Sequence, residues 1–395
     1  MLQQEAKSVI PYGRQNISDA DVQAVVDVLR SDFLTQGPAI PRFEKELADY
    51  CGARYAVAVS NATAGLHIAC LAAGLGPGDR LWTSPNTFVA SSNCALYCGA
   101  QVDFVDIDPV TYLMSVEALA RKLEDTPADE LPKIVVPVHF AGQSCDMVAI
   151  AELSREYGFM VMEDAAHSVG GSYKGSKIGS CQYSDMTVFS FHPVKVITTG
   201  EGGMVMTNDE ELYQKLIRLR SHGITRDAEF LAEKDGGPFY YEQLELGYNY
   251  RMTDIQAALG SSQMGRLDEF VARRHELVRL YDNLLAGLPV SLPFQHPDSY
   301  SAHHLYVIRL RPDEIKRTRR QVFDAMRAAG ILVNVHYIPV HTQPYYRNLG
   351  FDWGQFPEAE QYYREAITLP LYFDLHDYEQ DRVVDALKAA ISENA

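Results

Sequence analysis

The chain has 395 residues, of which 47% are apolar and 22% are charged, and such proportions are typical of a folded globular protein. This length favours two packed domains. The formal charge of −17 excludes a protein that binds nucleic acid through clustered basic residues.

The chain begins with MLQQEAKSVI, which lacks the basic start and apolar run of a signal peptide. No apolar run approaches the roughly 18 residues that span a membrane. We therefore expect a cytoplasmic protein with neither a membrane nor a nucleic-acid partner.

From Tyr55 onward, short β-branched runs alternate with helical patterns. The expected strands and the first helix are YAVAVS, NATAGLHIACLAAGL (the helix), VDFVDI, KIVVPVHF, FMVMED, TVFSF and GMVMTN. Such alternation predicts an α/β fold, with a mostly parallel sheet covered by helices on both faces. Ligands of such folds bind at the carboxyl ends of the strands.

After residue 266 the pattern changes. The segment DEFVARRHELVRLYDNLLAGL predicts a long charged helix, and HHLYVIRL and ILVNVHYI predict strands separated by a helix in RRQVFDAMRAAG. DYEQDRVVDALKAAI predicts a closing helix. We expect a large domain over 1–266 and a smaller α+β domain over 267–395, with a shared cleft.

Six cysteines, at positions 51, 70, 94, 98, 145 and 181, form no CxxC pair and no regular framework. We expect reduced, buried thiols. Cys94 and Cys98 are one helical turn apart, but two thiolates without a nearby histidine or further cysteine make a poor zinc site. No metal is expected.

The junction VSNATAGL places a strand end directly before a helix. Free N–H groups of the first helical turn and the Thr63 hydroxyl would point at one spot, which suits a phosphate. A plain helix cap explains the same residues, because Ser, Asn and Thr favour that position. Neither GxxxxGK nor GxGxxG occurs.

Two further charged residues follow strands. Asp164, after GFMVME, is expected at a strand end where its partly desolvated charge needs a partner, although a helix cap is an equal alternative. Lys195 follows TVFSF after Pro193 and precedes TTGEGG. A lysine held at that edge acquires a lowered pKa and becomes a nucleophile for a carbonyl, whereas an exposed lysine would be only a surface cation.

A phosphate cradle, a carboxylate and a reactive lysine at one sheet edge match the needs of pyridoxal 5′-phosphate (PLP), which has a phosphate, a ring nitrogen and an aldehyde. Ser190 could add a hydroxyl to the phosphate site and Phe88 could stack on the ring. For each of these two residues, structural packing is an equal explanation.

Five segments resemble the DegT-type sugar-nucleotide aminotransferases, a family of fold-type I PLP enzymes. They are LTQGP (34–38), TFVA (87–90), EDAAHSVG (163–170), FSFHPVKVITTGEGGMV (189–205) and GYNYRMTDIQAALG (247–260). Within the family, SDFLTQGPAIPRFE, LRSHGITRD and VNVHYIPVHTQPYYR are most similar to the branch that serves pseudaminic acid biosynthesis. That branch moves an amino group from L-glutamate to C4 of a UDP-linked 4-keto-6-deoxy-N-acetylhexosamine.

The resemblance implies roles for individual residues and a homodimer with active sites at the subunit interface. It identifies Lys195 as the Schiff-base lysine, Asp164 as the partner of the pyridine nitrogen and His167 as a catalytic residue against the ring. The implied cofactor-binding residues are Ala62, Thr63, Phe88, Asp164, Ser190, Lys195 and, from the other subunit, Asn249. The implied substrate-binding residues are Tyr12, Thr35, Gly37, Arg251, His336 and Tyr337.

Two features depart from the family pattern. The cradle SNATAGL lacks one hydroxyl that the branch usually carries beside Thr63, and Asn86 stands where an apolar residue is common. Because the substrates are anionic, we also expect a local basic patch that includes Arg251, with Arg220 or Arg226 as a further contributor. Alternatives are an aminotransferase for another nucleotide-linked keto-sugar and a regulatory homologue without turnover. A dehydratase of the family has histidine at the lysine position, and Lys195 argues against it.

Overall fold

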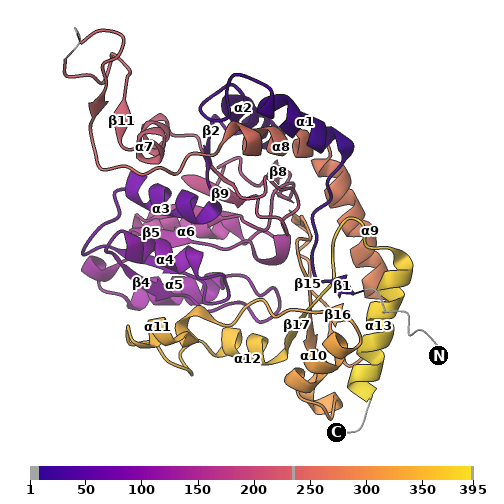
Figure 1. The fold of residues 1–395 in the computed structure, drawn as a ribbon. Helices are drawn as coiled ribbons and strands as arrows, with labels where there is room; N and C mark the ends of the chain where they lie inside the picture. The colour runs from indigo at the N-terminus through magenta and orange to yellow at the C-terminus, as the bar shows by residue number, and fades with distance from the viewer. Residues whose placement is uncertain (1–8, 234–235, 393–395) are drawn as a thin grey trace.

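The computed structural model describes residues 9–233 and 236–392. Figure 1 shows a large sheet with its helices beside a smaller C-terminal part. The strands of the large sheet are β2 (Tyr55–Val59), β3 (Arg80–Thr83), β4 (Gln101–Phe104), β5 (Ile134–Val136), β6 (Met160–Asp164), β9 (Met186–Ser190) and β10 (Gly203–Thr207).

The strand order in this sheet is β2-β10-β9-β6-β5-β3-β4. Strand β10 runs antiparallel to both of its neighbours, and the remaining pairs are parallel, which confirms a mostly parallel sheet. In the register of β6 and β9, Asp164 lies opposite Val188. Asp164 ends β6 and Ser190 ends β9, so both residues lie at the same edge of the sheet.

Helices cover both faces of the sheet. Alternate residues of β2 divide between two cores, since Val57 and Val59 pack with Leu66 of α3 while Ala56 and Ala58 pack with Phe43 of α2. Helices α3, α4 and α7 contribute to the core on one face. The opposite face has two cores, one with residues of α2 and α8 and the other with residues of α5 and α6. The helices are α1 (Asp19–Leu29), α2 (Ala39–Cys51), α3 (Ala62–Ala72), α4 (Ala90–Tyr97), α5 (Val116–Asp125), α6 (Met147–Tyr157), α7 (Glu210–Arg220) and α8 (Asp254–Met264).

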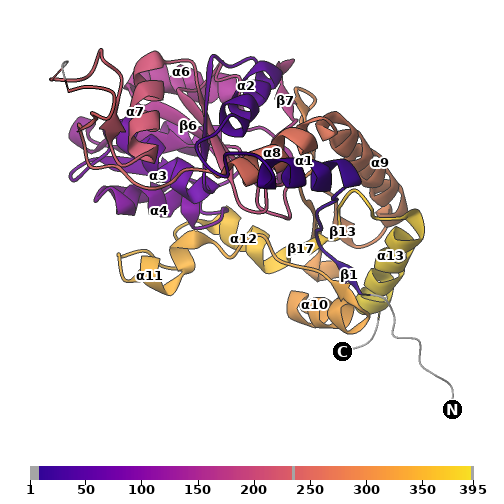
Figure 2. The same cartoon turned by 45° about the horizontal axis from the view of Figure 1, so that its top comes forward.

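The C-terminal part is built on a three-stranded sheet in the order β13-β15-β17, beside the helices α9, α10 and α13. Figure 2 shows α9 leading away from the large sheet to α13. The elements are α9 (Leu267–Leu285), β13 (Val290–Ser291), β15 (Tyr306–Leu310), α10 (Arg319–Ala328), β16 (Ile331–Leu332), α11 (Pro344–Arg347), α12 (Pro357–Glu365), β17 (Ala366–Leu369) and α13 (Asp377–Ser392).

Strands from the two sides of the predicted domain boundary at 266/267 pair with each other. The boundary itself remains a prediction. Strand β1 (Ile10–Pro11) pairs in parallel with β16, and β14 (Ser299–Tyr300) pairs with β7 (Ser172–Tyr173), whose other neighbour is β8 (Ser176–Lys177). Short 3-10 turns η1 (Ala128–Glu130), η2 (Phe140–Gly142), η3 (Pro312–Glu314) and η4 (Val340–Thr342) complete the described elements.

The expected strand over 331–338 is wrong in extent. Only Ile331 and Leu332 form a strand, and the backbone from 333 to 338 is irregular. The apolar and polar residues of this segment alternate as in a strand, but Asn334, His336 and Tyr337 line a cavity instead of joining a sheet.

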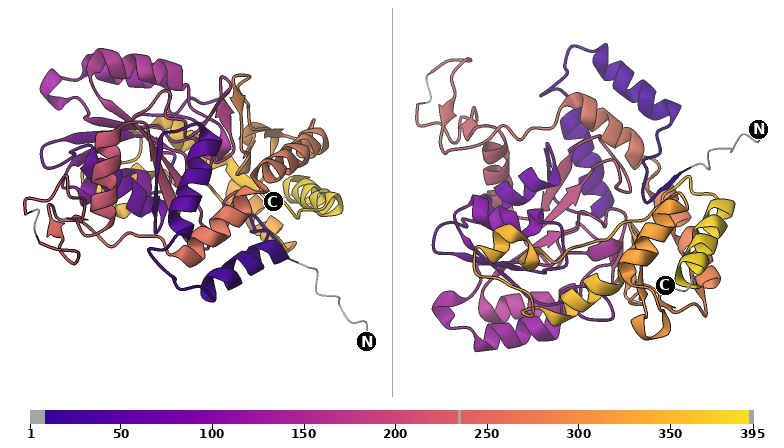
Figure 3. Two further views of the ribbon diagram at one scale, coloured as in Figure 1. Left: turned by 90° about the horizontal axis from the view of Figure 1, so that it is seen from above. Right: turned by 60° about the horizontal axis from the view of Figure 1, so that its bottom comes forward.

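A hairpin of β11 (Ile224–Thr225) and β12 (Glu242–Gln243) projects from the large sheet (Figure 3). Near it, Phe239 and Leu246 are 79% and 78% exposed.

All six cysteines are buried and free. The Cys98 thiol contacts Cys70 and His67, which the sequence did not indicate. In the described part of the chain, no three or more His, Cys, Asp or Glu side chains are grouped to hold a metal ion. Nor does any described helix have the length and apolarity needed to cross a membrane.

Candidate active site

A cavity of about 760 Å³ lies at the carboxyl ends of β6 and β9 and reaches the C-terminal part. Its lining includes these residues predicted from the sequence: Tyr12, Ala62, Thr63, Phe88, Asp164, His167, Ser190, Lys195, His336 and Tyr337. The structure therefore brings together residues that are more than 300 positions apart in the chain.

The N-terminus of α3 forms one wall of the cavity. Asn61, which the sequence analysis did not single out, caps the helix by accepting a hydrogen bond from the Ala64 N–H at 2.8 Å. No hydrogen bond to another described residue is made by the N–H groups of Ala62 and Thr63. These N–H groups and the positive end of the helix dipole suit a phosphate.

Asp164 is held at the cavity by two donors. The Ser91 hydroxyl donates to Oδ2 at 2.5 Å, and the Ala166 N–H donates to Oδ1 at 3.1 Å. Thr87 contacts Ser91 in turn, with 2.7 Å between their hydroxyl oxygens. Asp164 is 6% exposed, so its carboxylate is fixed in direction and largely shielded from water. Sequence reasoning missed Ser91, because this buried residue of α4 lies 73 positions before Asp164 in the chain.

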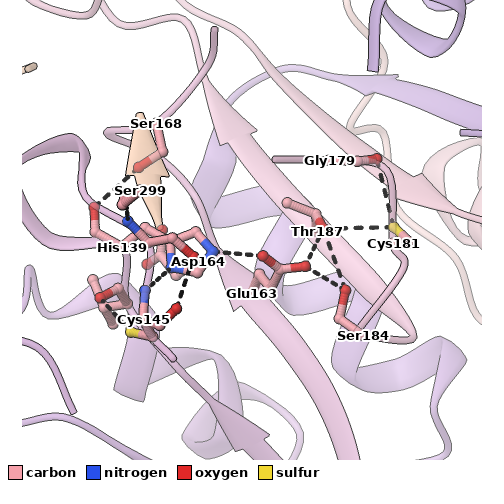
Figure 4. Close-up of polar contacts among 12 residues, drawn as sticks. His139, Cys145, Glu163, Asp164, Ser168, Gly179, Cys181, Ser184, Thr187 and Ser299 are labelled. Carbon is pink, nitrogen blue, oxygen red and sulfur yellow. Dashed lines mark hydrogen bonds and ion pairs between the residues drawn. The ribbon is translucent and has the colours of Figure 1, made fainter. Parts of the chain in front are cut away.

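Glu163 points to the other side of β6 and anchors the strand (Figure 4). It pairs with His139 at 2.5 Å, and the Thr187 hydroxyl donates to it at 2.9 Å. Ser184 is a third donor, at 2.5 Å. Burial alone would raise the pKa of Glu163, but these hydrogen bonds lower it below its ordinary value. Glu163 thus supports Asp164 through the backbone and does not line the cavity.

Lys195 follows β9 in a tight turn, in which its N–H donates to the His192 carbonyl at 2.9 Å. Burial of its ammonium lowers the pKa of Lys195 to about 8, although the Asp164 charge opposes this shift. A lysine with this pKa is partly neutral near physiological pH and can attack a carbonyl. The predicted lowered pKa therefore has a physical basis in the fold.

His167 has a defined tautomer. Its Nδ1 accepts a hydrogen bond from the Ala141 N–H at 3.3 Å, so the proton resides on Nε2, which lies 3.0 Å from the Tyr337 hydroxyl oxygen. Burial, and then the nearby charge of Lys195, hold the pKa of His167 well below its ordinary value. The ring is therefore neutral and donates to Tyr337.

Two more neutral histidines surround Lys195. Burial and the Lys195 charge lower the pKa of His336 to about 3, and its Nδ1 lies 2.9 Å from the Thr368 hydroxyl oxygen. The pKa of His304 is also well below its ordinary value, again because of burial and then Lys195. His304 was not singled out from the sequence, although it lines the cavity.

Four predicted residues do not line the cavity of the single chain: Thr35, Gly37, Asn249 and Arg251. The Gly37 N–H donates to Asp254 at 2.8 Å, which fixes the loop before α2. Asn249 and Arg251 form isolated backbone bridges with Ser221 and Val59. Their roles toward a second subunit stay predictions.

The expected basic patch does not include Arg220. Its guanidinium is 2.5 Å from Glu44 and donates to the Ala58 carbonyl at 2.8 Å, so it holds β2 and α2 together. Arg226 lies against the Tyr241 ring, at 5.8 Å.

Asn86 has a structural explanation. Its Nδ2 donates to the Tyr112 carbonyl at 3.3 Å, and its Oδ1 accepts from the Tyr337 N–H at 3.3 Å. An apolar residue could not make these bonds. The departure from the family pattern therefore fixes the position of Tyr337.

These groups fit PLP. The open N–H groups of α3 with Thr63 and Ser190 suit its phosphate, and Asp164 suits its ring nitrogen. No described residue makes a hydrogen bond or ion pair with the Lys195 ammonium, so the lysine is free for the aldehyde. The fold and the cavity define a PLP-dependent enzyme of fold type I.

Comparisons with known proteins identify the family to which this PLP-dependent enzyme belongs. Residues 15–388 match the DegT/DnrJ/EryC1/StrS aminotransferase family. The spore coat polysaccharide biosynthesis protein SpsC of Bacillus subtilis is 40% identical over 388 residues, which cover 98% of each chain. The chain therefore belongs to the DegT/DnrJ/EryC1/StrS family of sugar aminotransferases.

Two solved structures share the fold over nearly the entire chain. PseC of Helicobacter pylori, an aminotransferase involved in the biosynthesis of pseudoaminic acid, has a TM-score of 0.88 and 28% identity, covering 97% of this chain and 99% of its own. The PLP form of the putative sugar aminotransferase Spr1654 of Streptococcus pneumoniae has a TM-score of 0.87 and 30% identity, covering 97% and 98%.

Proposed function

We propose that this aminotransferase moves an amino group from L-glutamate to C4 of a UDP-linked 4-keto-6-deoxy-N-acetylhexosamine, as in pseudaminic acid biosynthesis. The structural similarity to PseC supports this substrate. The greater sequence identity to SpsC favours the alternative of a different nucleotide-linked keto-sugar in polysaccharide synthesis. A regulatory homologue is disfavoured, because a lysine, a carboxylate and a helix N-terminus that suits a phosphate line one cavity.

The observation that carries the proposal is Lys195, with a pKa lowered to about 8, facing the same cavity as Asp164. A regulatory protein needs neither a nucleophilic lysine nor a desolvated carboxylate beside it. Both features destabilise the folded chain, since burying a charge costs free energy, and their presence in one cavity therefore favours a catalytic role.

Each residue then has a task. The bound cofactor supplies the aldehyde that accepts the amino group and the ring that takes up electrons. Lys195 would hold the aldehyde and, once released, carry a proton at the substrate carbon, while Asp164 keeps a proton on the ring nitrogen. Thr63 and Ser190 would bind the phosphate. His167 would lie against the ring and fix its orientation.

The substrate side of the cavity would be formed by Tyr12, His336 and Tyr337. The rings of Tyr12 and His336 are 5.4 Å apart, and both line the cavity. Because His336 is neutral, it can donate or accept a hydrogen bond without adding charge. Such groups suit the hydroxyls and the carbonyl of a sugar, and aromatic faces suit its C–H surface.

We further propose that the enzyme is a homodimer whose partner completes the site. Among the described residues that line the cavity, Lys195 is the one lysine or arginine, beside the carboxylates of Asp164 and Glu201. A diphosphate and the carboxylates of glutamate require more positive charge than this. The predicted contribution of Arg251 across an interface would supply positive charge, and that of Asn249 a neutral hydrogen-bonding amide.

The buried free thiols fit a reducing compartment, and we propose the cytoplasm.

The test is product analysis with L-glutamate and a panel of nucleotide-linked keto-sugars. The panel should vary the nucleotide, the C5 configuration and the N-acetyl group one at a time. We expect the highest kcat/KM for the UDP-linked 4-keto-6-deoxy-N-acetylhexosamine, with the new amine at C4. A higher kcat/KM for a sugar without the N-acetyl group would reject this substrate in favour of the alternative.

A further inference from the structure

His304 is a cavity residue to which no role has yet been given. It is 4% exposed, and its ring centroid lies 4.5 Å from that of His167, at an interplanar angle of 44°. Its Nδ1 is buried without a hydrogen-bond partner, and none of the hydrogen bonds among described residues involves its Nε2. The contact between His304 and His167 is therefore one between rings.

The backbone beneath His304 is held by a buried arginine. Arg274 of α9 is 2% exposed, and its Nη1 donates to the carbonyls of His303, His304 and Leu371 at 3.0, 3.2 and 3.1 Å. It makes no ion pair with a described carboxylate. Its Nε is buried without a hydrogen-bond partner among the described residues, so the bonds from Nη1 offset only part of the cost of burying the guanidinium, and they gather the three carbonyls around one nitrogen.

The turn η2 holds the same segment from the other side. The Ala302 N–H donates to the Gly142 carbonyl at 3.0 Å, and the Leu305 N–H donates to the Ala141 carbonyl at 3.2 Å. Ala141 is also the residue whose N–H donates to His167. At Gly142, φ is 108°, and a Cβ would lie 2.6 Å from the His303 nitrogen. The segment 302–305 and the turn η2 are thus bonded to each other, and each contacts His167: the turn through the Ala141 N–H and the segment through the His304 ring.

We propose that His304, held by Arg274, is a positioning residue that presses its ring against His167 and keeps His167 neutral and oriented toward the cofactor. This inference rests on the proposed aminotransferase function. It assigns a purpose to a buried arginine whose hydrogen bonds to described residues all go to carbonyls, and to a histidine whose ring makes no hydrogen bond with a described residue.

The charged and titratable surroundings agree with this role. Lys195, His336, His304 and Tyr337 surround the His167 ring, Asp164 and Glu201 line the same cavity, and Arg274 lies behind His304. Removing the His304 ring would admit water or a dipole to the buried face of His167. His167 would then gain a proton in the pH range where histidine ordinarily titrates, roughly pH 5–7.

Two substitutions of His304 distinguish the contribution of its aromatic ring from that of its ring nitrogens. His304→Phe keeps an aromatic face without nitrogens, and His304→Gln keeps polar atoms without a ring; both fill the space. The visible absorbance of the bound cofactor is titrated against pH without substrate. We expect His304→Phe to titrate like the wild type, and His304→Gln to gain a second transition between about pH 5 and 7.

Arg274→Lys, which cannot reach three carbonyls in the same geometry, should show the same second transition at smaller amplitude. A His304→Gln protein that binds cofactor and titrates like the wild type would overturn the proposal. So would a His304→Phe protein that behaves like His304→Gln, because the nitrogens would then carry the role. Failure to aminate the UDP-sugar, with these titrations as expected, would reject the proposed substrate alone.

Discussion

The lowered pKa of Lys195 predicts a specific pH dependence of folding stability in the cofactor-free protein. The pKa is about 8 in the folded chain and 10.5 in an unfolded one. This difference corresponds to about 3 kcal/mol of destabilisation, as an upper value because the cavity admits water. Replacing Lys195 with Met removes the buried charge and keeps most of the side-chain volume.

The sign follows from proton binding. Between about pH 8 and 10.5 the unfolded wild type binds more protons than the folded one, so its stability rises with pH. Below pH 8 the penalty is fully present, and above about 10.5 it is gone. Lys195→Met should therefore be more stable than the wild type at pH 7 by up to about 3 kcal/mol, and this gain should disappear toward pH 10.5.

The assay is urea unfolding followed by circular dichroism, at one protein concentration, in steps from pH 7 to pH 10.5. Lys45→Met is the matched control, because Lys45 is 74% exposed and pairs only with Asp49 on the surface. It should show no pH-dependent gain. Equal gains in stability for Lys195→Met at pH 7 and at pH 10.5 would contradict this prediction, because the gain would then come from packing and not from the removed charge.

Three further substitutions test the supports of the site. Ser91→Ala removes the 2.5 Å donor to Asp164 and should weaken PLP binding by about 10-fold, measured by equilibrium titration; unchanged affinity would contradict it. Gly142→Ala places a Cβ 2.6 Å from the His303 nitrogen and should lower the free energy of unfolding by about 2 kcal/mol more than Gly350→Ala, where φ is 104° against 108° at Gly142 but the Cβ would meet open space. Arg220→Gln breaks the pair with Glu44 and should lower stability by about 2 kcal/mol without changing either KM; a raised KM at unchanged stability would restore Arg220 to the substrate site.

The strand ends at the site were predictable from sequence because they follow local rules. Asp164 and Ser190 each end an apolar run, and parallel strands bring such ends to one edge. Lys195 follows the second of these strands directly. The sequence therefore predicted the position of Asp164 and Ser190 at one edge of the sheet, because each ends a single apolar strand.

The supporting residues were not predictable in this way. Ser91 and Arg274 act across long sequence distances and carry no local pattern. The segment 333–338 alternates like a strand, but its backbone is irregular where Asn334 and Tyr337 reach the cavity. Tertiary contacts overrode local propensity there. Roles that need a second subunit, such as those of Asn249 and Arg251, lie beyond a single chain.

We propose that Lys195 is the nucleophile of a two-step amino transfer. The most direct measurement is the visible spectrum of the purified protein with PLP, then with L-glutamate, then with the UDP-linked 4-keto-sugar, with Lys195→Ala in parallel. We expect a band that forms only in the wild type, disappears with glutamate and returns with the keto-sugar. A band that also forms in Lys195→Ala, or that glutamate leaves unchanged in the wild type, would show that Lys195 is not this nucleophile.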